Sequence, residues 1–127
     1  MTLYTTYFAN LKKLPAGITP VSICAKAPEW YHGWQYKALA PKYGFFMRWK
    51  ETHDNDYYVR CFNAEVLDTL SCEKVLQDFS IITDGDIALV CYEKPTDFCH
   101  RHLVSAWLRN HGISCREWDE SYTGKEA

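Results

Sequence analysis

The chain lacks any long apolar run. No stretch of its 127 residues approaches the roughly 18 consecutive apolar residues that make a membrane-spanning helix. It also lacks an excess of charge of one sign, since 14 Lys and Arg stand against 16 Asp and Glu. Generic binding to duplex nucleic acid depends on a broad basic surface. We therefore expect neither membrane insertion nor duplex binding.

Signals for export are missing as well. The first ten residues contain neither the basic nor the apolar segment of a secretory signal. A chain of this length with 47% apolar residues can bury an ordinary core and does not need disulfides for stability. We therefore expect a cytoplasmic protein whose six cysteines are free thiols.

A complete set of metal-ligand pairs is also absent. The chain offers Cys99-His100 with His102, and the pair His111 and Cys115, but no second knuckle. The cysteines stand at positions 24, 61, 72, 91, 99 and 115, with no Cys-x-x-Cys pair among them. Zinc sites usually contain such pairs, and the signature of zinc deaminases is not present either. A phosphatase loop would need Arg six residues after its Cys, where this chain has Asp97 and Ser105. We expect no metal site and no cofactor.

The apolar runs that are present predict strands. The segment at residues 87–91 is continuously apolar, which is typical of a central strand covered on both faces. β-branched, aromatic or apolar residues predict three more strands. These lie at residues 3–7, 20–24 and 113–118.

Helical spacing of apolar residues separates these strands. Phe45, Phe46 and Trp49 can share one helical face, and a longer helix is expected at residues 98–111. A strand, a helix and a strand in this order form a βαβ unit. We therefore expect an α/β fold with a small, mostly parallel sheet and helices on both faces. Residues 1–118 would form one domain, and residues 119–127 a polar tail.

Capping residues mark the expected ends of the helices. Asp54 and Ser71 precede helical segments as N-caps, and Gly112 follows the last helix as its C′ residue. Thr96 or Asp97 is expected to cap the helix at residues 98–111.

The loop after the central strand is the expected functional centre. In open α/β sheets, ligands bind beyond the carboxyl ends of the strands, where helix N-termini present free N–H groups. Here that place contains Cys91, Tyr92 and Glu93, followed by Cys99, His100 and Arg101. Helix amides and the Arg101 guanidinium suit a phosphate or carboxylate. We expect Arg101 to contribute to ligand affinity and little to folding.

Three of these residues have chemistry that allows more than one role. Glu93 can accept hydrogen bonds from ribose hydroxyls or act as a base, or it can be an ordinary solvated carboxylate. A helix N-terminus beside His100 and Arg101 lowers a thiol pKa, so Cys99 is a candidate nucleophile, although structural cysteine is the commoner case. His100 can contact a ligand or orient the loop by a backbone hydrogen bond.

An irregular aromatic loop occupies residues 25–44. Its length exceeds that of ordinary connections, and its Trp30, Tyr31 and Trp34 have the flat faces that stack on a nucleotide base. Core packing or a partner surface is the alternative. Tyr58 and Arg60 are further candidates for lining the same pocket.

Four segments carry a family resemblance. Residues 90–95 (VCYEKP) and 99–104 (CHRHLV) resemble the Cys-x-Glu-Lys and Cys-His-Arg hallmark of the domain-of-unknown-function 488 family. Residues 27–31 (APEWY) and 36–41 (YKALAP) are similar to its short members, which occur in bacteria and their phages. The resemblance implies a Rossmann-like α/β fold. The motif positions are Cys91, Glu93, Cys99, His100 and Arg101.

The leading functional hypothesis is a binding protein for a small anionic, nucleotide-derived ligand of the nucleotide or ADP-ribose type. A phage protein of this kind would sequester a host immune nucleotide signal in the host cytoplasm. The alternative is an enzyme, a nucleotide or nucleoside hydrolase or transferase that uses Glu93, Cys99 or His100. A second alternative is a protein-interaction module that uses the aromatic loop. The sequence leaves the oligomeric state open.

Overall fold

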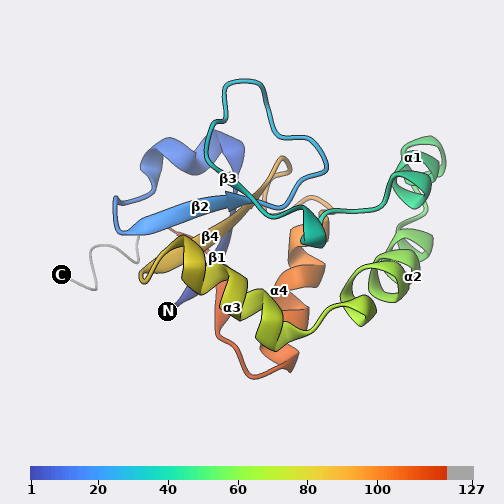
Figure 1. The fold of residues 1–127 in the computed structure, drawn as a ribbon. Coiled ribbons are helices and arrows are strands. Elements are labelled where there is room, and N and C mark those ends of the chain that lie inside the picture. The colour runs from blue at the N-terminus through green and yellow to red at the C-terminus, as the bar shows by residue number, and fades with distance from the viewer. Residues whose placement is uncertain (120–127) are drawn as a thin grey trace.

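Five short strands, each paired in parallel with its neighbours, form the centre of the fold (Figure 1). The computed structural model describes residues 1–119, so most of the expected polar tail lies outside the described residues. The sheet has the order β3-β2-β4-β1-β5. The strands are β1 (Leu3–Tyr7), β2 (Ile18–Ser22), β3 (Trp34–Gln35), β4 (Asp86–Cys91) and β5 (Cys115–Glu117). The predicted α/β class with a parallel sheet is confirmed.

The four α-helices contribute their buried side chains to one core, on one face of the sheet. They are α1 (Tyr43–Thr52), α2 (Asn55–Glu65), α3 (Cys72–Ile82) and α4 (His100–Asn110). The other face is covered by the 3-10 helix η1 (Phe8–Lys13), the aromatic loop and Trp118. Two further 3-10 helices are η2 (Lys37–Leu39) and η3 (Leu67–Thr69). Helical segments thus lie on both faces, but the second face has only a short one.

The predicted caps are mostly confirmed. The Asp54 carboxylate accepts a hydrogen bond from the Tyr57 amide at 3.1 Å, and the Ser71 hydroxyl accepts one from the Lys74 amide at 3.3 Å. Gly112 has a φ of 80°, in the left-handed region that favours glycine. The expected cap of α4 is wrong. That helix begins two residues later than expected, at His100, with Cys99 as an N-cap whose side chain makes no capping bond.

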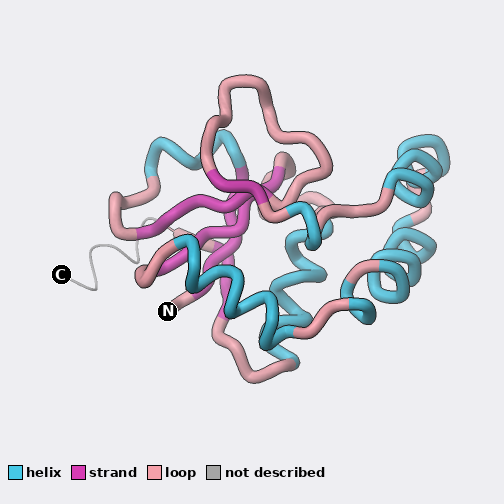
Figure 2. The backbone as a smooth tube through the Cα atoms, in the orientation of Figure 1, coloured by secondary structure: helices cyan, strands magenta, loops and turns pink. Residues whose placement is uncertain are grey.

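The α1–α2 pair stands beside the sheet, while the aromatic loop arches over it (Figure 2). Phe45 of α1 and Phe62 of α2 belong to the same buried core as Val21 and Leu89 of the central strands. This packing fixes the helical pair against the carboxyl edge of the sheet. The space between that edge and the pair is the place where a ligand site can form.

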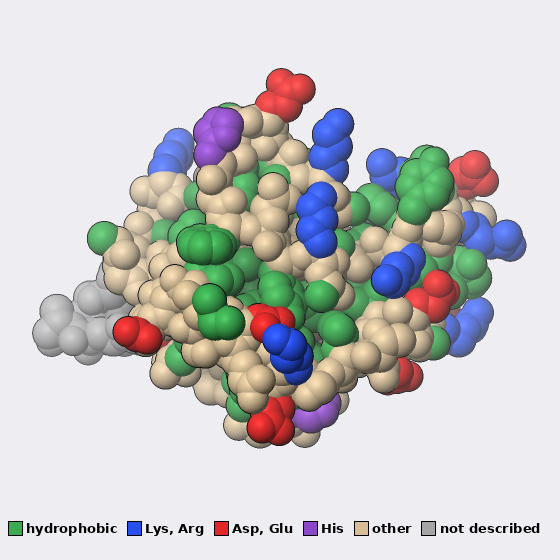
Figure 3. Space-filling model, viewed as in Figure 1, with side chains coloured by type: hydrophobic (Ala, Val, Ile, Leu, Met, Phe, Trp, Pro, Cys, Tyr) green, Lys and Arg blue, Asp and Glu red, His purple; other side chains and the backbone are tan. Residues whose placement is uncertain are grey.

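The surface fits the charge balance of the sequence. On the face drawn in Figure 3, acidic and basic side chains are interspersed. Across residues 1–119, none of the helices combines the length and the apolar character needed to cross a bilayer. All six cysteines lie in this part of the chain and are unpaired.

Candidate functional site

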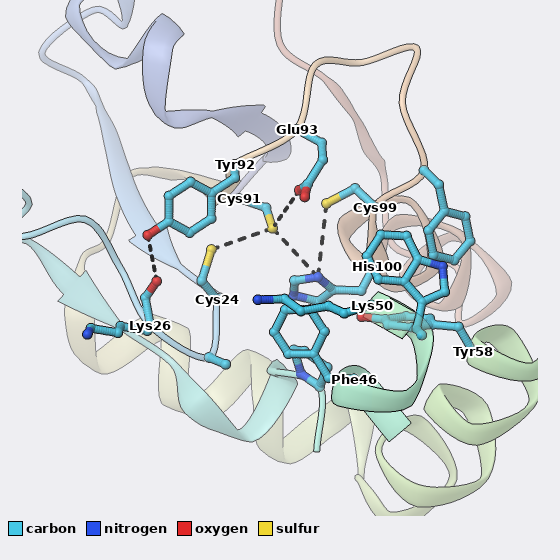
Figure 4. A pocket seen from close by; sticks show the side chains of 14 residues that line it. Cys24, Lys26, Phe46, Lys50, Tyr58, Cys91, Tyr92, Glu93, Cys99 and His100 are labelled. Carbon is cyan, nitrogen blue, oxygen red and sulfur yellow. Dashed lines mark hydrogen bonds between the residues drawn. The ribbon is translucent and has the colours of Figure 1, made fainter. Parts of the chain in front are cut away.

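A cavity of about 360 Å³ opens beyond the carboxyl ends of β2 and β4 (Figure 4). The segments after these strands supply its floor, and α1, α2 and the start of α4 supply its walls. This is the position where open α/β sheets hold their ligands. Five of the predicted site residues line it. They are Cys91, Tyr92, Glu93, Cys99 and His100.

Four rings, which we call the aromatic wall, form one side of the cavity: Phe46, Trp49, Tyr58 and Phe98. Trp49 stacks on Phe98 with ring centroids 5.6 Å apart, and on Phe46 at 6.5 Å, each pair inclined by 30°. The Trp49 indole N–H donates to the Asn55 side chain at 2.7 Å, which fixes the ring. Phe46, Trp49 and Phe98 thus present flat faces suited to a planar molecule, while the Tyr58 ring stands edge-on to Trp49 and Phe98, at 69° and 88°.

His100 at the start of α4 has a defined proton position. Its Nε2 lies 2.7 Å from the Ile23 carbonyl oxygen, which can only accept, so Nε2 carries the proton of the neutral ring. The other nitrogen, Nδ1, then presents a lone pair. It faces the sulfur of Cys91 at 3.6 Å and that of Cys99 at 4.0 Å. The predicted hydrogen bond from His100 to the backbone is thus present. It leaves Nδ1 able to accept a proton or to bind a ligand.

The thiols at the floor are close to one another. Cys91 Sγ lies 3.5 Å from Cys24 Sγ, and a hydrogen bond between these two thiols, with burial, raises the pKa of Cys91. A hydrogen bond with Cys91, with burial, likewise raises the pKa of the Cys99 thiol. The expectation that the helix N-terminus lowers the pKa of Cys99 is therefore wrong. The hydrogen bond with Cys91 and burial together raise the pKa of Cys99 more than the neighbouring His100 lowers it.

Glu93 and Tyr92 close the cavity from the strand end of the loop. Glu93 Oε2 lies 3.6 Å from Cys91 Sγ, and Figure 4 shows its carboxylate pointing toward the two thiols. The Tyr92 hydroxyl donates to the Lys26 carbonyl at 2.7 Å, which ties the loop after β4 to the loop after β2. A carboxylate, two thiols and an imidazole thus converge on one space.

Arg101 has a different position from the predicted one. It is fully buried, at 0% exposure, and is not among the residues that line the cavity. Its Nε and Nη2 donate to the two carboxylate oxygens of Glu117 at 3.2 and 3.1 Å, and its Nη1 donates to the Glu93 carbonyl at 2.5 Å. Because every arm of the guanidinium is used internally, Arg101 positions Glu93 and holds β5 to α4.

The predicted site residues of the aromatic loop, Trp30, Tyr31 and Trp34, also lie outside the cavity lining, to which the loop contributes only Ala25, Lys26 and Pro41 near its ends. Tyr31 is buried against Phe8, and its hydroxyl donates to the Trp34 carbonyl at 2.6 Å. Trp30 and Trp34 remain 60% and 53% exposed. The structure therefore assigns Tyr31 to the core of the second sheet face and leaves the two tryptophans on the surface, where the partner-surface alternative still applies.

Sequence reasoning missed most of the cavity's other residues. Of the two helical candidates, Tyr58 lines the cavity and Arg60 does not. Phe46 and Trp49 have the spacing of core residues, and Cys24 follows a strand without any motif. Only the docking of the α1–α2 pair against the sheet edge turns these residues toward one space, and no local pattern encodes it.

The fold and the site together define an all-parallel α/β domain with a thiol, imidazole and carboxylate site at the carboxyl edge of its sheet. The family model described as the active DUF488-N3 subclade matches residues 10–112. The chain therefore belongs to the DUF488 family, as its motif segments indicate. Searches among curated proteins and among solved structures gave no match.

The first prediction concerns Arg101. Arg101→Ala leaves the Glu117 carboxylate and the Glu93 carbonyl without their donor, and removal of one partner of a buried ion pair costs about 3–5 kcal/mol. We expect denaturant unfolding to show a loss in this range. Arg60→Ala, an exposed control, should leave stability nearly unchanged. Equal stability of the Arg101 variant and wild type would show that the ion pair does not hold the fold.

The second prediction concerns the proton on His100. Since the Ile23 carbonyl requires a donor, the neutral ring should carry its proton on Nε2 and none on Nδ1. Nitrogen chemical shifts from ¹⁵N-histidine-labelled protein should give this pattern for His100. The exposed His32 should show the ordinary mixture of tautomers. A protonated Nδ1 on neutral His100 would contradict the proposed orientation.

Proposed function

We propose that the chain binds a small, flat, negatively charged molecule of the nucleotide or ADP-ribose type in the cavity beyond β2 and β4. The observation that carries this proposal is the aromatic wall, which faces a polar floor across one enclosed space. Small-molecule sites combine apolar and aromatic walls with a few convergent polar groups in just this way. A volume of about 360 Å³ lies near the small end of the usual range, which favours a mononucleotide-sized portion of the ligand.

Each part of a nucleotide has a counterpart in the cavity. A base can stack on Trp49 or Phe98, which gains about 1–3 kcal/mol per stacked base. Lys26 and Lys50 line the cavity and offer charge to a phosphate. The partial positive charge at the N-terminus of α4 would reinforce that charge. Glu93 can accept hydrogen bonds from ribose hydroxyls.

A second candidate is an enzyme that transforms the same ligand. The observation that favours it is the approach of the His100 Nδ1 lone pair to two thiols, with the Glu93 carboxylate beside one of them. An imidazole acceptor next to a thiol is the arrangement that activates a cysteine nucleophile. The matching family model is described as an active subclade, which supports keeping this candidate.

The proposed ligand class and the free cysteines together suggest a biological setting. Six unpaired cysteines support a reducing compartment such as the cytoplasm. If the ligand is bound and released unchanged, sequestration of a nucleotide signal is the use that this cavity serves best. If it is converted, the same cavity belongs to a nucleotide hydrolase or transferase.

One experiment separates the two candidates. The purified protein is incubated with a library of nucleotides and ADP-ribose derivatives, and the bound and free fractions are analysed by mass spectrometry. Recovery of the intact ligand from the protein supports binding. Appearance of a new mass that depends on Cys91, Cys99 or His100 supports catalysis. If the protein neither retains nor converts any compound of the library, the proposal of a nucleotide-type ligand is wrong.

The third prediction tests the aromatic wall against the aromatic loop. Trp49→Ala should weaken a nucleotide ligand by up to roughly 100-fold, because one stacking surface is lost. Trp30→Ala and Trp34→Ala are matched controls that remove exposed rings outside the cavity, and both should bind like wild type. Calorimetric titrations with parallel melting curves would correct for any unfolded fraction. If only the Trp30 and Trp34 variants bound the nucleotide more weakly, the ligand site would lie at the aromatic loop and not in the cavity.

The fourth prediction concerns Lys50. Its ammonium group lies 4.9 Å from the Phe46 ring centre and lines the cavity, so it can reach an anionic group stacked beside it. Lys50→Ala should lower affinity by roughly 10-fold, the cost of one charge-assisted hydrogen bond at an exposed position. The variant should also respond less to added salt than wild type does. Lys12→Ala on η1 is the control, and an equal loss there would indicate a nonspecific charge effect.

A further inference from the structure

Three potential metal ligands meet at the floor of the cavity. The sulfurs of Cys91 and Cys99 and the Nδ1 of His100 all lie within 4.8 Å of one another, and all three residues are buried. We call them the thiol–imidazole cluster. Stacking and phosphate binding by the cavity do not need this cluster. Its presence therefore requires a separate explanation.

The orientation of His100 is the one that metal sites use. A ligating histidine almost always donates its other ring N–H to a carbonyl or carboxylate, which fixes the ring and points the remaining lone pair at the ion. His100 makes this bond, from Nε2 to the Ile23 carbonyl at 2.7 Å. Its Nδ1 faces the two sulfurs of the cluster at 3.6 and 4.0 Å, and thiols are weak donors.

The spacing matches a tetrahedral ion. With zinc–sulfur bonds of about 2.3 Å and zinc–nitrogen bonds of about 2.0–2.1 Å, tetrahedral angles place sulfur and nitrogen roughly 3.6 Å apart. The observed separations from Nδ1 are 3.6 Å to Cys91 and 4.0 Å to Cys99. Both separations lie within a few tenths of an ångström of that value. The two sulfurs lie within 4.8 Å of each other, and a tetrahedral ion would hold them roughly 3.8 Å apart.

We propose that Cys91 Sγ, Cys99 Sγ and His100 Nδ1 bind a divalent ion of the zinc class, with a fourth position open to the cavity. Three protein ligands and one open position are the pattern of catalytic rather than structural zinc sites. Two thiolates balance the charge of the ion, and thiolate with imidazole is a donor set that zinc accepts readily.

Glu93 and Cys24 flank the open position. Glu93 Oε2 lies 3.6 Å from Cys91 Sγ, and its carboxylate points toward the cluster in Figure 4. Cys24 Sγ lies 3.5 Å from Cys91 Sγ on the opposite side. Neither belongs to the group of three mutually close ligands. A water molecule or a donor atom of the ligand would take the fourth place, within reach of the Glu93 carboxylate.

The fifth prediction is that the intact chain binds about one zinc or cobalt ion. Protein purified without chelator is analysed for metals, then stripped and titrated with Zn²⁺ and Co²⁺. Cobalt should give thiolate charge-transfer absorption and the visible bands of a tetrahedral ion. Cys91→Ser, Cys99→Ser and His100→Ala should each weaken binding by at least roughly 100-fold, because loss of even an outer-shell partner costs about 10- to 100-fold. Cys61→Ser and Cys72→Ser are controls that should bind normally.

A second measurement uses the unaltered chain, so it does not depend on the variants folding. Because burial already shields Cys91 and Cys99 in the native chain, alkylation is followed in mild denaturant, where the chain opens. Bound zinc should slow the modification of these two residues, and chelator should remove that protection without changing Cys61. Peptide mass spectrometry locates the modified sites. Absence of cobalt bands, or alkylation that zinc leaves unchanged, would overturn the proposal. If the protein binds metal but no nucleotide, only the proposed function is wrong. If the stripped protein binds a nucleotide but takes up no metal, only the proposed metal site is wrong.

Discussion

The hydrogen bond from His100 to the Ile23 carbonyl is the contact on which the site depends. It joins the first residue of α4 to the segment just after β2, two parts of the chain that are 77 positions apart. A buried carbonyl without a partner is costly, so this contact is strongly favoured in the folded chain. It brings the start of α4 to the central strands and fixes the ring nitrogen that faces Cys91 and Cys99.

Arg101, the next residue, holds the same helix start from the other side. Its bidentate pair with Glu117 connects α4 to the edge strand β5, and its bond to the Glu93 carbonyl fixes the loop after β4. Consecutive helical residues point about 100° apart, so His100 and Arg101 necessarily face different surroundings. The Cys-His-Arg segment thus combines two residues that line the cavity, Cys99 and His100, with Arg101, which holds the helix start in place.

The sequence predicts the elements well, because strands and caps are encoded locally. The apolar run of β4 and the capping bonds of Asp54 and Ser71 depend on neighbours within a few residues. The start of α4 could not be placed as well, since no side chain caps it and its position is set by the distant contacts of His100 and Arg101. The strand expected at residues 20–24 begins earlier, at Ile18, because pairing with β4 extends it.

The residues of the site also fall into two groups, those that local sequence predicts and those that depend on distant packing. The motif segments identify Cys91, Glu93, Cys99 and His100 as members of one cavity, since a strand end and the following helix start must lie close together. The aromatic wall comes from α1 and α2, whose docking depends on packing across the whole core. Trp30 and Trp34 have the right composition for stacking, but composition does not say which way a loop folds. The loop instead covers the opposite sheet face.

The aromatic wall and the floor of the cavity favour different chemical groups. A single type of group, such as an aromatic ring, does not satisfy both. The aromatic wall is apolar and flat, and a planar ring satisfies it by contact alone. The floor contains a buried imidazole acceptor, His100 Nδ1, which faces the sulfurs of Cys91 and Cys99. Since buried acceptors are stabilised by good donors or by cations, the floor favours a partner that a purely aromatic ligand does not supply. An ion at the floor would provide it and would also draw an anionic group of the ligand toward the same space. The wall and the floor then cooperate, with the ring held by stacking and the charge held near the ion.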